Sequence, residues 1–87
     1  MKNPANVYRL LDERTKLEAL QLAVNNAGFW SDLWESHDEE GFWSLSVGPY
    51  EVCIDNKGYV VYDFDVKMLN TDSITEITNF LNRTYED

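Results

Sequence analysis

Over residues 4–27, apolar side chains recur every three or four positions, which is the spacing of an amphipathic helix. Gly28 follows this stretch and is a residue type that commonly ends helices. Within the stretch, Thr15 and Glu18 have the spacing of a capping box, which normally marks a helix start. We therefore expect one long helix or two helices that meet near residues 13–15, and the capping box favours two.

Beyond Gly28 the apolar period changes to two, which indicates β-strands. The alternation of apolar and polar side chains is clearest in residues 42–47 and 50–54. Gly48-Pro49 and the Asp-Asn-Lys-Gly sequence at residues 55–58 are typical of turns. The expected strands cover residues 29–35, 42–47, 50–54 and 59–64. Connections this short predict an antiparallel meander of three or four strands.

A second helix is predicted near the C-terminus. Ser73 and Glu76 form another capping-box pattern, and apolar residues follow at helical spacing. Residues 65–70 are expected to form the connection before it. The predicted fold class is α+β, with an N-terminal helix (possibly two), a three- to four-stranded antiparallel meander, and a C-terminal helix packed on one face of the sheet. We expect residues 1–87 to form a single compact domain.

Acidic residues are unevenly distributed along the chain. The net charge is −9, and residues 28–56 alone carry seven acids and no Lys or Arg. These acids are Asp32, Glu35, Asp38, Glu39, Glu40, Glu51 and Asp55. Nucleic-acid backbones and anionic membranes are bound through Lys and Arg, so the sequence disfavours both as direct ligands. It favours a basic protein partner, reached by fast and salt-sensitive association.

The composition indicates a folded, soluble chain. Hydrophobic residues make up 44% of the sequence and aromatic residues 14%, which is enough for one modest core. The single cysteine, Cys53, cannot form an intramolecular disulfide, which fits a reducing compartment. No apolar run approaches the roughly 20 residues that span a bilayer, and the first residues do not resemble a secretion signal. We therefore expect a cytoplasmic protein, in the host cytoplasm if the chain is phage-encoded.

Two residues are candidates for nucleophilic or acid–base chemistry, and neither has the surroundings that such chemistry needs. His37 is the only histidine and stands among acids in an expected loop, which is typical of a solvated histidine. Cys53 lies within an expected strand, and its acidic neighbours oppose a reactive thiolate. We therefore expect no catalytic residue and no enzyme activity.

The acid-rich segments also raise the question of a metal site. The acids around His37 match neither an EF-hand loop nor a zinc pattern. Asp63 and Asp65 form a pair at a strand end of the kind that Mg²⁺-dependent enzymes use, but such enzymes also need further ligands and usually a lysine or histidine nearby, and the pair is typical of a strand leaving the sheet. The glycines are isolated, so there is no phosphate-binding loop. We predict no metal site and no cofactor.

The Trp and Tyr residues of the expected strands cannot all face one small core. In a strand, Trp30 and Trp34 share one face, while Phe29 and Leu33 take the other. If one set is buried against the helices, the other is exposed on the sheet. Exposed aromatic residues beside carboxylates are typical of protein–protein hot spots, although aromatic residues also simply enlarge the core of small domains.

Together these features favour a small non-enzymatic inhibitor or interaction module. Carboxylates on a rigid scaffold can imitate nucleic-acid phosphates and occupy the basic, nucleic-acid-contacting surface of a partner. The residues expected to bind that partner are Asp32, Glu35, Asp38, Glu39, Glu40, Glu51, Asp55, Trp34 and Trp43. In size and charge the chain resembles phage-encoded inhibitors, including many anti-CRISPR and anti-restriction proteins, and immunity proteins that block nuclease toxins. The likeness is one of profile and assigns no role to an individual residue.

Two further interpretations stay open. The chain could be a structural or interaction protein that forms a homodimer through exposed sheet aromatics, in which case the acids only maintain solubility. Less in keeping with the pattern, Asp63, Asp65 and His37 could serve a small metal-dependent hydrolase.

Overall fold

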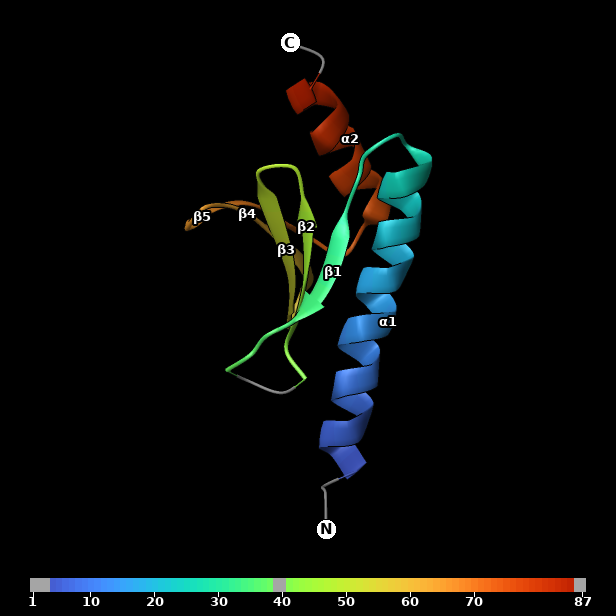
Figure 1. Cartoon of the computed structure of the whole chain (residues 1–87), viewed down its shortest axis with the longest axis vertical. Coiled ribbons are helices and arrows are strands. Elements are labelled where there is room, and N and C mark those ends of the chain that lie inside the picture. Colours follow the sequence, from blue (N-terminus) through green and yellow to red (C-terminus); the bar gives the residue numbers. More distant parts are fainter. Residues whose placement is uncertain (1–3, 39–40, 86–87) are drawn as a thin grey trace.

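A computed structural model describes residues 4–38 and 41–85, with the side chains of residues 13–38 and 41–84. The elements are α1 (Pro4–Asn26), β1 (Asp32–Glu35), β2 (Trp43–Val47), β3 (Tyr50–Asp55), β4 (Gly58–Asp63), β5 (Val66–Thr71) and α2 (Ile74–Tyr85) (Figure 1). The strands form one antiparallel sheet in the order β1-β2-β3-β4-β5, so each strand pairs with its neighbours along the chain. This arrangement confirms the predicted α+β class and the meander.

The N-terminal segment is one uninterrupted helix, and the break expected near residues 13–15 is absent. The buried side chains of Leu17, Leu20 and Val24 follow one another along the side of α1 that packs on the sheet. Glu13, one helical turn before Leu17, is buried as well, so the packed side of α1 extends across the position of the expected break. Continuous packing therefore outweighs the local capping signal. The Tyr59 hydroxyl also donates a hydrogen bond to a backbone carbonyl within α1, that of Lys16, over 2.8 Å.

The sheet has five strands rather than three or four, because residues 65–70 do not form the expected connection. Most of them belong to β5, which pairs with β4 along its whole length. A shift in register between Val61 and Tyr62 interrupts the alternation of the pair. The first half of β5 is exposed on both sides, so its apolar residues do not follow a period of two. Because of these two irregularities, the pattern of apolar and polar residues does not predict the strand.

Both helices pack on the same face of the sheet and share one core. The buried apolar residues of this core are Leu17, Leu20, Val24, Leu45, Val47, Tyr50, Val52, Tyr59, Val61, Ile77 and Leu81. Phe80 of α2 lies at its margin, with its ring in an edge-to-face contact with Tyr50 at a centroid distance of 5.3 Å. The predicted alternation is confirmed, since Leu45, Val47 and Val52 all point toward the helices.

The opposite side of the sheet, which we call the open face, has no helix over it (Figure 1). It carries Asp32, Trp34, Ser44, Ser46, Glu51, Cys53, Asp55, Val60, Tyr62, Lys67 and Asn70. Val60 lies at its centre, opposite Cys53 and Asn70 on the neighbouring strands, and is only 2% exposed. The neighbouring side chains of the open face therefore cover Val60, and the surface that remains is mainly polar.

Candidate partner-binding surface

One line of side chains crosses all five strands of the open face. From β1 to β5, the paired positions are Asp32, Ser46, Glu51, Tyr62 and Lys67. Neighbouring strands are about 4.8 Å apart, so Asp32 and Glu51 are separated by roughly 10 Å across β2. The line is acidic over β1 to β3 and basic at β5. Ser46, Tyr62 and Lys67 were not among the residues predicted for the site, and Lys67 joins it only because residues 66–71 form β5.

Of the two tryptophans predicted to bind the partner, Trp34 is the one that the structure places on this face. Its indole N–H donates to the Ser46 hydroxyl over 2.9 Å, and the side chain remains 36% exposed. The hydrogen bond fixes the ring, so a partner would not have to order it on binding. Trp30, in the connection between α1 and β1, is 80% exposed. The prediction that Phe29 and Leu33 take the core side is confirmed.

Asp55 lies farther along β3 from Glu51 and has two partners of its own. Its Oδ1 atom accepts the backbone N–H of Lys57 over 2.8 Å within the β3–β4 turn, and the Asn70 amide lies 3.4 Å away. The two acids are four positions apart in the strand, which corresponds to roughly 13 Å. Asp55 therefore contributes charge to the open face while it also holds the turn.

Glu35 and Trp43, although predicted to bind the partner, lie on the helix side of the sheet as a cross-strand pair. A Glu35 carboxylate oxygen accepts the backbone N–H of Gly41 over 2.9 Å, which closes the β1–β2 loop. The guanidinium of Arg14 stands 5.1 Å from the centroid of the Trp43 ring and also bonds Glu18 over 2.8 Å. Arg14 is thus close to the acidic region in space although it is distant from it in sequence.

The β1–β2 loop holds the remaining predicted acids. Asp38 and His37 are both exposed there, and the backbone N–H of Asp38 donates to the Ser36 hydroxyl over 3.3 Å. Glu39 and Glu40 lie outside the described residues. Of the nine residues expected to bind a partner, the structure brings four together on the open face, namely Asp32, Trp34, Glu51 and Asp55.

A hollow of about 300 Å³ lies beside the open face, near the loop ends of β2 and β3. Its wall contains two carboxylate side chains and three aromatic ones, from Glu13, Glu51, Trp34, Phe42 and Trp43. Carboxylates next to aromatic rings are the groups that bind a guanidinium or an ammonium ion. The Trp43 ring already contacts one guanidinium, that of Arg14. Glu13 comes from α1, whereas all the predicted site residues come from residues 28–56, so the hollow was not predicted from the sequence.

Cys53 also lies in the wall of the hollow, in surroundings that keep its thiol protonated. Burial raises the pKa of the Cys53 thiol above its ordinary value, and the nearby Glu51 carboxylate acts in the same direction. The sulfur lies 3.5 Å from the Ser44 hydroxyl and donates to a Glu51 oxygen at 3.7 Å. A thiol with a raised pKa is a poor nucleophile at neutral pH. Its place in the hollow is therefore one of packing and weak hydrogen bonding.

The residues considered for metal-dependent hydrolysis are far apart. In a meander, successive connections lie at opposite ends of the sheet. The β1–β2 loop with His37 and the β4–β5 turn with Asp63 and Asp65 are the first and fourth connections, so they lie at opposite ends. Among the described residues, no group of three or more His, Cys, Asp or Glu side chains is arranged to hold a metal ion. Neither α1 nor α2, as far as they are described, combines the length and the apolar character that crossing a bilayer requires.

Comparison with known proteins assigns no family, since no family model, curated protein or solved structure matches the chain.

Proposed function

We propose that this chain is a non-enzymatic interaction module that binds a basic surface of a partner protein through the open face and the adjoining hollow. The observation that carries the proposal is the wall of the hollow, where Glu13 and Glu51 stand beside three aromatic side chains. A volume of about 300 Å³ accommodates one arginine or lysine side chain of the partner. Its cationic head would meet the carboxylates, and its aliphatic stem would pack on the rings.

Longer-range attraction supports the same role. The acids of the open face and of the β1–β2 loop have no Lys or Arg among them in sequence, so a basic partner is attracted before contact. The three acids of the open face, Asp32, Glu51 and Asp55, are nevertheless roughly 10–16 Å apart by strand geometry. Duplex DNA carries one charge per about 1.7 Å of its axis, which is far denser. The proposal therefore rests on a complementary field and an inserted side chain, not on an imitation of each phosphate.

Partner surfaces that contact nucleic acids are the richest in arginine and lysine, and we propose such a surface as the target. The chain would then exclude nucleic acid from the partner by occupying the same cations. An inhibitor of a nucleic-acid-processing protein, of the phage anti-defence or toxin-immunity kind, would act in this way.

A short arginine-rich peptide that binds duplex DNA serves as the probe. Its affinity for the chain is measured by calorimetry and by the fluorescence of the tryptophans. Glu51→Gln removes a charge from the hollow, and we expect it to weaken binding at least about tenfold. Asp65→Asn is the matched control, because it removes one charge from an exposed position in the β4–β5 turn, away from the hollow; we expect less than about a twofold change.

Two outcomes separate the parts of the proposal. Equal affinities of the wild-type chain and the Glu51→Gln variant would show that the hollow does not bind the cation, and the proposal would fail. The second measurement adds the chain to a complex of the peptide with duplex DNA. If the peptide binds the chain but the DNA is not displaced, competition with nucleic acid is wrong, while a basic partner remains the target.

A further inference from the structure

β5, the last strand of the sheet, exposes apolar side chains. β5 ends the strand order, so in the described chain no strand pairs with its outer edge. Val66 is 61% exposed and Met68 is 46% exposed. Natural proteins protect such edges with proline, several charges or a β-bulge, whereas β5 contains no proline, one charged residue, Lys67, and the single register irregularity next to Met68. With so few of these features, the edge presents its backbone to another strand.

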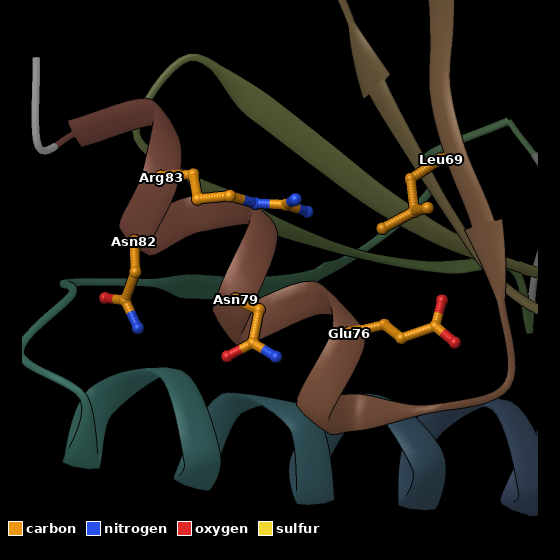
Figure 2. Close-up of a pocket in the computed structure, with 5 residues that line it drawn as sticks. All are labelled: Leu69, Glu76, Asn79, Asn82 and Arg83. Carbon is orange, nitrogen blue, oxygen red and sulfur yellow. The ribbon is translucent and has the colours of Figure 1, made fainter.

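A groove runs beside this edge, between β5 and α2. It consists of two adjoining hollows of about 560 and 470 Å³, which share Leu69 and Arg83. Apolar side chains of Met68, Leu69 and Phe80 line the groove. Figure 2 shows the long side chains of Glu76 and Arg83 reaching from α2 toward the side where Leu69 lies. Neither forms an ion pair with any other described residue.

We propose that a second copy of this chain covers the edge, with the two β5 strands paired antiparallel across a twofold axis. Antiparallel pairing keeps each face of the sheet continuous, so residues of the open face must oppose one another, and we choose the register that meets this condition and is centred on β5. Lys67 and Asn70 both belong to the open face, because they pair with Tyr62 and Val60. Opposing Lys67 of each copy to Asn70 of the other makes Val66 face Thr71 and Met68 face Leu69. The axis then passes between Met68 and Leu69, and the two sheets form one continuous sheet.

The same axis brings opposite charges of the two α2 helices together. Two residues separate the end of β5 from the start of α2, and Figure 2 shows α2 leaving this connection at an angle to the strand, with Glu76 nearer to the connection and Arg83 farther from it. The hollows place the middle of α2, near Phe80, beside Met68 and Leu69. Because Glu76 and Arg83 lie on either side of this midpoint, Glu76 of each copy faces Arg83 of the other. Their positions along the helix are about 10.5 Å apart.

The pairing of the β5 strands and the opposite charges of the α2 helices fit the same twofold axis. This agreement favours a second copy over an unrelated strand. A twofold interface requires one surface to be complementary to itself. Here one axis pairs all six residues of β5, closes the two apolar grooves over Phe80 and Met68, and forms two equivalent Glu76–Arg83 ion pairs. An unrelated peptide would need the same features in its own sequence. The inference does not rest on the proposed function, because the hollow beside the open face lies near β2 and β3 and not at the β5 edge.

Sedimentation equilibrium tests the inference through charge exchange. At about 100 μM, where a dimer with a micromolar Kd is almost fully formed, the wild-type mass is expected to be twice 10.2 kDa. Glu76→Arg and Arg83→Glu each create two like-charge contacts in a homodimer, so each weakens it at least about tenfold. An equal mixture of the two variants restores both ion pairs and is expected to give a heterodimer. Trp30→Ser, at an exposed aromatic residue outside the interface, leaves the mass unchanged.

Two results would overturn the inference. One is a wild-type mass of 10.2 kDa at the concentration given above. The other is a mixture of the charge variants that associates no better than either variant alone. If a charge variant fails to fold, Met68→Glu replaces it, because Met68 is partly exposed and two glutamates would then lie beside the axis. A Met68→Glu chain that still dimerises as tightly as the wild type also contradicts the proposed interface.

Discussion

Replacing Gly58 by alanine tests how closely the β3–β4 turn approaches the connection between β5 and α2. Gly58 follows the two-residue turn and pairs with Asp55, and its φ angle is +123°. A Cβ atom at this position would stand 2.8 Å from the Cα atom of Asp72 and 3.0 Å from the carbonyl oxygen of Thr71. Both neighbours are backbone atoms, so they cannot rotate away as the end of a side chain can.

Gly28 provides a matched control for the magnitude. Its φ angle is +99°, and a Cβ atom there would meet nothing within 4 Å. Gly28→Ala therefore carries only the conformational cost of a side chain at positive φ, about 1–2 kcal/mol. Gly58→Ala carries a similar cost and adds overpacking against a backbone, typically 1–3 kcal/mol, which makes about 2–5 kcal/mol in all. The two variants should thus differ by at least about 1 kcal/mol.

Urea unfolding, followed by tryptophan fluorescence and by circular dichroism, measures both free energies of unfolding. In a domain of this size, a difference of 1 kcal/mol corresponds to about 4–8 °C in Tm. Agreement of the two probes establishes that unfolding is two-state and that the values are comparable. If Gly58→Ala and Gly28→Ala lose the same stability, the close approach of Gly58 to Asp72 does not constrain the fold, and the reasoning is refuted.

Two further predictions concern buried polar groups. Tyr59→Phe removes the hydroxyl that donates to the Lys16 carbonyl over 2.8 Å, so it should lower the free energy of unfolding by about 1 kcal/mol; an unchanged urea midpoint would count against that hydrogen bond. Burial raises the pKa of the Cys53 thiol, so less thiolate is present at a given pH in the folded chain than in the unfolded one. Iodoacetamide at pH 8, a mildly basic pH just below the usual thiol pKa of about 8.5, should alkylate Cys53 more slowly in buffer than in denaturing urea; equal rates would contradict this.

Local features of the fold were predictable because they depend on residues that are close together in sequence. The Ser73 hydroxyl accepts the backbone N–H of Glu76 over 3.3 Å, as its capping pattern predicts. Asp55 accepts the N–H of Lys57 in the predicted turn. The alternation in β2 and β3 correctly separates the helix side from the open face.

The candidate site was predictable only in part. Sequence analysis found the acid-rich segment, and alternation places Asp32 and Trp34 on one face. Loop closure by Glu35 and the contact between Arg14 and Trp43 depend on the folded loop and on α1. The hollow likewise requires Glu13, which is distant in sequence from every other residue in its wall.

By itself, the sequence determined the α+β class, most of the strands and turns, the C-terminal helix and the strongly acidic middle of the chain. Each follows from composition or from contacts between near neighbours. Tertiary structure alone decided that α1 is continuous, because its stripe packs on one sheet, and that β5 exists, because it pairs with β4 despite an irregular pattern. It also decided which acids share a surface and which edge stays open. Those outcomes depend on long-range pairing and on shared burial, which no local pattern encodes.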